Sequence, residues 1–170
     1  MSSRVECSLR PVDEWIEMFP YGVAVGPDQV RPVMIFKDKT ERRVLPVWMS
    51  PVDAGIAMSQ SAITGTDASP HNLTQKMLST LGVQIERCYF VRTNGHYQIV
   101  ELQFSGSEKL KKLESRADEV ISFCLHNDVR FFCRADLIEE SRRIDSELLG
   151  MSQEIQAMMV DGPGPGPYLN

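Results

Sequence analysis

Several short runs of the chain alternate hydrophobic and polar positions, and a period of two predicts β-strands. The predicted strands cover residues 21–25, 33–36, 44–49, 84–92, 97–104, 109–113 and 129–133. Thr93-Asn94-Gly95 joins the two longest runs, and Asn-Gly is the strongest short-range hairpin signal. The polar residues 37–41 join two of the earlier runs in the same way, so we expect two hairpins.

Three stretches between these runs carry the signals of helix starts. Ser50-Pro51 puts a capping serine before a proline, and Asp53 follows three residues after the serine. Ser69-Pro70 repeats this start before an apolar helix face that ends at Gly82 and comprises Leu73, Met77, Leu78 and Leu81. Ser115 to Asp118 forms a capping-box pattern, and its helix should end near Asn127.

Two further helices are predicted outside these stretches. One is short and lies around Trp15, and the other spans residues 135–149 and is polar enough to be exposed. Together the elements predict an α+β fold, with a mixed β-sheet built from hairpins and helices packed on it. A hairpin followed by a helix occurs twice, and residues 50–57 loosely echo residues 115–122, which suggests an internal duplication of this unit.

Length and composition limit the chain to one main domain with appendages. Its 170 residues are 42% hydrophobic and 24% charged, as in ordinary globular proteins, so we exclude collagen-like, disordered and disulfide-dense chains. No apolar run approaches the ~20 residues of a membrane span, and residues 1–10 lack a signal-peptide stretch. We expect a cytoplasmic protein without a membrane partner. The expected division is a lead-in (1–19), an α+β domain (20–138), an acidic helical extension (139–160) and a disordered Pro/Gly tail (161–170).

The net charge of −5 is concentrated at one end of the chain. Residues 136–170 hold seven acidic and two basic side chains, which leaves the remainder neutral. A neutral body lacks the bulk charge of a tight nucleic-acid binder, although local basic clusters occur at Arg42-Arg43 and over residues 109–116. Each cluster is also explained as a solvated polar face. The acidic helix is a candidate surface for a protein partner.

Cysteine and histidine spacing gives no sign of a preformed metal site. The four cysteines form no C-x-x-C pair, and the three histidines form no zinc-binding motif. No organic cofactor is indicated.

Three segments in fixed order resemble the bifunctional nuclease domain of bacteria and plants. Residues 45–54, Leu-Pro-Val-Trp-Met-Ser-Pro-Val-Asp-Ala, are similar to the family's L-P-I-W-I-G-x-x-E-A. Residues 70–73, Pro-His-Asn-Leu, are similar to T-H-D-L, and residues 114–121, Glu-Ser-Arg-Ala-Asp-Glu-Val-Ile, to D-S-R-P-S-D-A-I. The resemblance covers roughly residues 20–138 and implies an α+β domain that is commonly dimeric and has DNase and RNase activity.

The chain departs from the family pattern at several motif positions. Asn72 stands where the family has aspartate, Ala117 replaces a proline, and Asp67-Ala68 replaces the Arg-Pro before the second motif. Asp53 aligns with a glutamate, and Glu119 with an aspartate. Asparagine can orient or cap but cannot replace an anionic metal ligand, so the chain is a divergent member by this resemblance.

Two motif residues have both a functional and a structural interpretation. Asp53 is a candidate metal-binding or acid–base carboxylate, and equally a helix-cap carboxylate worth roughly 0.5–2 kcal/mol. His71 should lie in the first turn of its helix, where the positive helix end favours the neutral imidazole of a general base. The alternative is a histidine packed against a strand.

The third motif supplies the remaining candidates. Arg116 is a candidate phosphate clamp or an ion-pair partner of a neighbouring carboxylate. Asp118 fits a reciprocal capping residue, and Glu119 is the better functional candidate by alignment. We expect His71, Arg116, Glu119 and Asp53 as catalytic residues, Asn72, Ser115 and Arg116 as substrate-binding residues, and Asp53 with Glu119 as ligands of Mg²⁺ or Mn²⁺.

The sequence therefore supports two hypotheses of different class. The first is a nuclease that hydrolyses phosphodiester bonds of DNA or RNA with a divalent ion, and that forms a homo-oligomer, most simply a dimer. The alternative is a non-catalytic dimeric module on the same fold, which binds a protein or an anion and uses the motif residues as caps.

Overall fold

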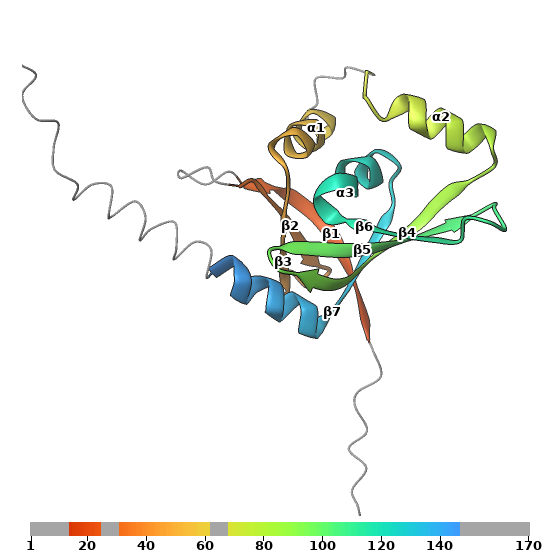
Figure 1. Cartoon of the computed structure of the whole chain (residues 1–170). Coiled ribbons are helices and arrows are strands. Elements are labelled where there is room, and N and C mark those ends of the chain that lie inside the picture. Colours follow the sequence, from red (N-terminus) through yellow and green to blue (C-terminus); the bar gives the residue numbers. More distant parts are fainter. Residues whose placement is uncertain (1–13, 25–30, 62–67, 147–170) are drawn as a thin grey trace, which may run out of the picture.

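The computed structural model describes residues 14–24, 31–61 and 68–146 (Figure 1). The predicted turn at 26–28, the part of the acidic extension after residue 146 and the predicted tail at 161–170 lie outside these residues. No helix of the described part is long and apolar enough to cross a membrane.

One mixed sheet of seven strands organises the described residues, and the predicted α+β fold is confirmed. The strands are β1 (Trp15–Ala24), β2 (Val33–Asp38), β3 (Val44–Trp48), β4 (Gln84–Asn94), β5 (Tyr97–Ser105), β6 (Lys112–Arg116) and β7 (Arg130–Arg134). Their order in the sheet is β3-β2-β1-β7-β4-β5-β6. The pairs are antiparallel except for β4 with β7, which is parallel.

Both predicted hairpins are present. β2 pairs with β3, and β4 pairs with β5 across a turn in which Gly95 has a φ of 59°. Such a positive φ suits glycine because it has no Cβ. Figure 1 shows that a meander of three strands followed by a helix occurs twice: β1-β2-β3 leads into α1 (Pro51–Ser61), and β4-β5-β6 leads into α3 (Ala117–His126). β7 lies between the halves.

The helices lie on both sides of the sheet. α1 and α3 contact each other above it in Figure 1, whereas the helical segment 135–146, drawn in blue, lies below it. This segment buries Leu137, Ile138, Ser141 and Ile144, so the prediction of an exposed helix is wrong for one of its faces. α2 (Asn72–Thr80) projects at the side and buries none of its residues.

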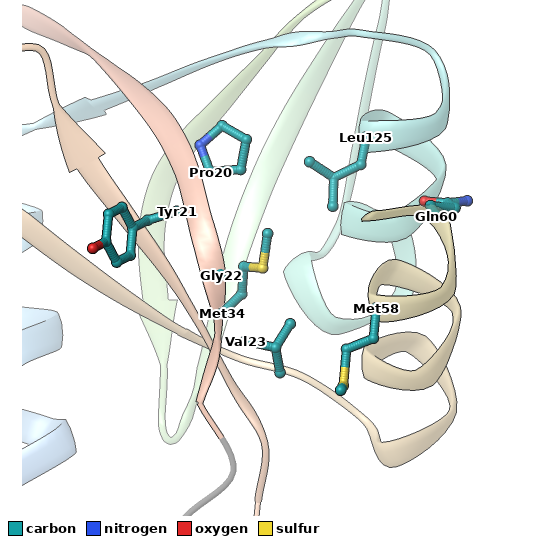
Figure 2. Close-up of a pocket in the computed structure, with 8 residues that line it drawn as sticks. All are labelled: Pro20, Tyr21, Gly22, Val23, Met34, Met58, Gln60 and Leu125. Carbon is teal, nitrogen blue, oxygen red and sulfur yellow. The ribbon is translucent and has the colours of Figure 1, made fainter. Parts of the chain in front are cut away.

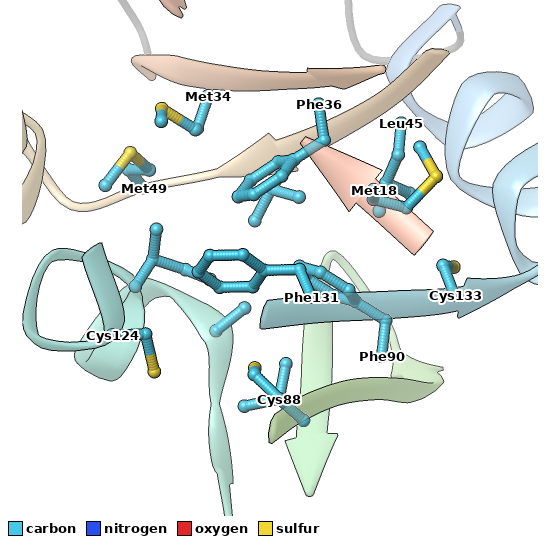
Figure 3. Packing of buried hydrophobic residues seen from close by; sticks show 14 of the residues in the cluster. Met18, Met34, Phe36, Leu45, Met49, Cys88, Phe90, Cys124, Phe131 and Cys133 are labelled. Carbon is cyan, nitrogen blue, oxygen red and sulfur yellow. The ribbon is translucent and has the colours of Figure 1, made fainter. Parts of the chain in front are cut away.

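Aromatic side chains from three strands form the centre of the core (Figure 3). The ring of Phe36 meets the rings of Phe90 and Phe131 edge to face, with centroids 5.6 and 4.9 Å apart. Such edge contacts add stabilisation beyond the buried area alone. Cys88, Cys124 and Cys133 are free thiols buried in the same core, so they fill space there.

A single buried amide joins the two halves of the curled sheet. Gln98 of β5 accepts a hydrogen bond from the Trp48 backbone N–H at 3.3 Å and donates to the Pro46 carbonyl at 2.6 Å, both in β3. It also donates to the Ser141 hydroxyl at 3.2 Å, in the segment 135–146. Gln98 is 2% exposed, so these bonds replace the water that the amide loses.

The predicted helix around Trp15 is wrong. Trp15 begins β1, which pairs with β2 on one side and with β7 on the other. This segment forms a strand because Met18 then enters the core and the pairing on both edges satisfies the backbone N–H and C=O groups. The structure also places β6 three residues later than the predicted strand at 109–113.

Candidate active site at the junction of three helices

A chain of hydrogen bonds joins the three helices through Ser122. The Ser122 hydroxyl donates to the carboxylate of Asp53, and its backbone N–H donates to the other carboxylate oxygen at 3.4 Å. His71 Nε2 lies 2.8 Å from the same hydroxyl oxygen. Asp53 comes from the first turn of α1, Ser122 from the middle of α3, and His71 from the N-cap of α2. Asp53 and His71, which are 18 positions apart in the sequence, thus both contact Ser122 of α3.

With Asp53 ionised, one arrangement of protons satisfies this chain of contacts. The Ser122 hydroxyl then donates its one proton to Asp53, and its oxygen accepts the proton of His71 Nε2. In the neutral imidazole the lone pair then lies on Nδ1. No described residue forms a hydrogen bond with Nδ1, so this nitrogen is the basic atom of the site.

Burial sets the electrostatics of the pair. Asp53 is 7% exposed, and burial raises the pKa of its carboxyl above the ordinary value, while the two Ser122 bonds oppose this shift. Burial also lowers the pKa of His71, helped by the nearby His126. His71 is therefore neutral at pH 7 and able to accept a proton, whose charge Asp53 would balance through Ser122.

Serine hydroxyls bond the backbone at the starts of two of the three helices, as the sequence predicts, but the N-cap of α2 is His71 and not Ser69. Ser50 Oγ accepts the Asp53 N–H at 3.0 Å, which caps α1. Ser69 Oγ accepts the His71 N–H at 3.2 Å, and Gly82 ends the helix with a φ of 70°. The carboxylate of Asp53 accepts its hydrogen bonds from Ser122 in α3. Neither predicted role of Asp53, as a metal-binding or acid–base group or as a helix cap, includes this contact.

A polar stripe runs along the face of α3 that carries Ser122. Asp118, Ser122 and His126 are spaced four residues apart, so they lie on the same side of the helix. His126 Nε2 lies 3.0 Å from Gln75 Oε1 of α2, and the His71 ring packs edge-on against Phe123 with centroids 5.2 Å apart. These contacts hold the start of α2, which buries no side chain of its own.

The side chain of Arg116 is held by the carboxylate of Asp118. Its guanidinium donates to both oxygens of Asp118, from Nε at 2.9 Å and from Nη2 at 2.5 Å. The predicted capping box at Ser115 is wrong, because β6 continues to Arg116, which becomes the N-cap without a side-chain cap bond. Asp118 therefore orients Arg116 and is no reciprocal cap.

The remaining predicted site residues lie around this core. Glu119 is exposed, accepts the Ser115 hydroxyl at 3.2 Å and lies 3.9 Å from Arg116 Nε. Asn72 is the first residue of α2, directly after His71. The structure thus joins Asp53 with His71, and Arg116 with Ser115 and Glu119. Asp118 links these two groups. Its negative charge raises the pKa of Asp53, and its carboxylate oxygens accept hydrogen bonds from Arg116.

The two predicted metal ligands, Asp53 and Glu119, have different hydrogen-bond partners. Within the described ranges, no group of three His, Cys, Asp or Glu side chains is arranged to hold a metal ion. The carboxylate of Asp53 is bound by Ser122, and that of Glu119 by Ser115. The described residues therefore offer no preformed cluster of three ligands for the expected Mg²⁺ or Mn²⁺, and that ion stays a prediction.

A separate cavity of about 480 Å³ lies between β1 and the helices α1 and α3 (Figure 2). Its lining is mostly apolar, with side chains of Pro20, Val23, Met34, Met58 and Leu125 around it, whereas the ring of Tyr21 points to the other side of β1. Gln60 also lines it. None of the predicted site residues lines this cavity, so we place the candidate chemistry at the polar chain.

Sequence reasoning missed Ser122, His126 and Gln75. Ser122 stands in an otherwise apolar stretch of its helix, between Ile121 and Cys124, and is fully buried. A serine in such a stretch needs a polar partner, which is the signal that could have found it.

The fold and the polar junction define an α+β domain with a buried Asp–Ser–His chain. The bifunctional nuclease domain matches residues 34–145, more than half of the chain, and the chain belongs to that family. A comparison with curated proteins gave no match.

Proposed function

We propose that the protein hydrolyses phosphodiester bonds of DNA or RNA, with His71 as the general base. The observation that carries this proposal is the Asp53–Ser122–His71 chain, in a chain of the bifunctional nuclease domain family. A positioned base of this kind contributes typically 10²–10⁴-fold to a hydrolytic rate.

The proposed reaction starts with water beside Nδ1 of His71. The water oxygen adds to phosphorus while Nδ1 takes its proton, and the bond from phosphorus to the leaving oxygen breaks. The leaving oxygen takes up a proton from solvent. Ser122 is fully buried and bonded on both sides, so it positions His71 and does not attack phosphorus itself.

Arg116 supplies the positive charge of the proposed site. Its side chain is 40% exposed, and Asp118 occupies two of its five N–H donors, so donors remain for a phosphate oxygen. Arg116 is the N-cap of α3 and lies six residues before Ser122, or about 9 Å along the axis. A strand bound at Arg116 can therefore extend to His71.

The deciding experiment is cleavage of labelled single-stranded DNA and RNA by purified protein, with Mg²⁺, with Mn²⁺ and with EDTA. We expect cleavage by the wild type and a loss of at least about 100-fold in the His71→Ala variant. The control is Thr80→Ala, since Thr80 is an exposed residue at the other end of α2. Equal cleavage by all three proteins would indicate a contaminant and refute the proposal. The EDTA arm tests the expected metal dependence.

The rival proposal is a non-catalytic module that binds a protein or an anion. Its supporting observation is that Asp118 already neutralises Arg116 through two hydrogen bonds. Binding of an oligonucleotide without cleavage under any metal condition would favour this rival. The expected homodimer and a protein partner of the acidic C-terminal segment are also proposals, and light scattering of the full chain tests the first.

A further inference from the structure

Two arginines from distant parts of the chain meet at one tyrosine ring. The guanidinium carbon of Arg116 lies 3.7 Å from the ring centroid of Tyr97, and that of Arg31 lies 4.7 Å from it. Arg31 precedes β2, Tyr97 begins β5, and Arg116 ends β6. Three separate segments thus converge at Tyr97, a residue that is 36% exposed.

The local structure holds both guanidiniums in place. Arg31 Nη1 donates to the backbone carbonyl of His96 at 3.4 Å, next to the ring that it covers. The two Asp118 bonds hold Arg116. Contact with an aromatic face is a favourable site for a guanidinium, so each arginine is oriented before any ligand arrives.

Of the two guanidinium charges beside Tyr97, only that of Arg116 is balanced by a described carboxylate. Arg116 has Asp118, which is 7% exposed and faces inward, but Arg31 forms no ion pair with any described carboxylate. Like charges held near one ring repel each other unless an anion lies between or beside them. Among the described residues, the charge of Arg31 is therefore left for a bound anion to neutralise.

We propose that Arg31, Tyr97 and Arg116 bind a phosphate of the nucleic-acid strand that flanks the bond cleaved at His71. This inference rests on the proposed function and extends it, because it adds Arg31 and Tyr97 to the substrate-binding residues. Arg31 contacts the strand, and Tyr97 is a positioning residue that holds both guanidiniums. Guanidinium forks recognise phosphate oxygens with paired N–H donors, whatever the base sequence.

The test is binding of a fluorescein-labelled oligothymidylate to the full chain in EDTA, at several salt concentrations. Arg31→Ala should weaken binding about tenfold and lower the salt dependence by about 0.7 in log–log slope, the value for one phosphate contact on a single strand. The matched control is Arg142→Ala, which removes the same charge from an exposed position of the helical segment 135–146, on the side of the sheet opposite α1 and α3. It should bind like the wild type.

Conservative variants separate binding from folding. Tyr97→Phe keeps the ring and should retain binding, whereas Tyr97→Leu removes it and should weaken binding. Thermal melts of each variant show which ones are folded, and Arg31→Lys replaces the fork by a point charge for the case in which Arg31→Ala unfolds. Arg31→Lys should then bind more weakly than the wild type.

The result that overturns the inference is equal binding by Arg31→Ala, Arg142→Ala and the wild type, or no binding by the wild type. Cleavage is measured separately, so the two proposals fail in different ways. A wild type that binds through Arg31 but never cleaves refutes the hydrolysis alone. A wild type that cleaves, with Arg31→Ala unchanged in binding, refutes the phosphate site alone.

Discussion

Ser122 and Asp53 are 69 positions apart in the sequence, yet the hydroxyl and the backbone N–H of one donate to the carboxylate of the other. This relationship ties α3 to α1 at the point where His71 arrives from α2. Ser122 therefore has two roles: it supplies hydrogen bonds to the buried carboxylate of Asp53, and it orients the imidazole of His71.

Replacement of Ser122 by alanine should affect stability and activity together. The Ser122→Ala variant leaves the buried Asp53 carboxylate without its hydroxyl donor, which costs about 1–3 kcal/mol of unfolding free energy. Cleavage should fall about 10- to 100-fold, because His71 loses its orienting partner. Urea denaturation and the cleavage assay measure the two effects.

A double-variant cycle shows whether the two residues act as a unit. The cost of Asp53→Ala with Ser122→Ala should be smaller than the sum of the single costs, since each single variant already breaks the bond. Additive costs would mean that the bond contributes nothing to stability.

Protonation of His71 should limit activity on the acid side. Burial lowers the pKa of His71 below its ordinary 6.5, so the base stays neutral to lower pH than a free histidine. The midpoint of the acid limb of the pH–rate profile should therefore lie below pH 6.5. A pH–rate profile whose acid limb lies above pH 6.5 would exclude His71 as the base.

The same shift predicts a pH dependence of stability. Because the folded pKa is the lower one, the unfolded chain binds the proton more tightly in the window just below pH 6.5. Stability contributed by His71 is full above pH 6.5 and is lost as pH falls through the folded pKa. His71→Gln should flatten this slope in denaturation curves recorded between pH 7 and pH 5.

The Gln98 amide should be costly to remove. Gln98→Leu leaves the Trp48 N–H and the Pro46 carbonyl without these partners inside the protein, so we expect a loss of about 2–5 kcal/mol. Gln103→Leu is the matched control, because Gln103 is only half-buried and bonds Glu101 at 3.2 Å. It should cost less than about 1 kcal/mol.

Two glycines should respond to alanine in opposite directions. Gly106 has a φ of 80°, and a Cβ there would lie 1.8 Å from the Gly82 carbonyl oxygen, so Gly106→Ala should destabilise by about 1–3 kcal/mol. Gly55 lies exposed inside α1, with no atom within 4 Å of an added Cβ. Gly55→Ala should stabilise by about 0.5–1 kcal/mol. Thermal melts of both variants check the signs.

Local signals predicted the parts of the fold that depend on neighbouring residues. Asn94-Gly95 predicts its hairpin, Ser50 its helix cap and Gly82 its helix end, since each acts within a few positions. Ser115 failed as a cap because strand pairing of β6 with β5 continues to Arg116, and that pairing is a long-range effect.

The candidate site could be predicted only in pieces. The family motifs supply Asp53, His71 and Arg116, but nothing in their spacing shows that Ser122 joins the first two or that Asp118 holds the third. Arg31 and Tyr97 lie outside all three motifs, and only the curled sheet brings them to Arg116.

The attachment of α2 has a consequence for how the protein loses activity. α2 carries His71 but buries no side chain, and its start is held by contacts of His71 and His126 with neighbouring residues. An element with so few buried contacts opens locally at a free energy far below that of global unfolding. Amide protons of α2 should exchange with solvent long before those of β4, and warming should abolish the proposed cleavage activity while the sheet remains intact.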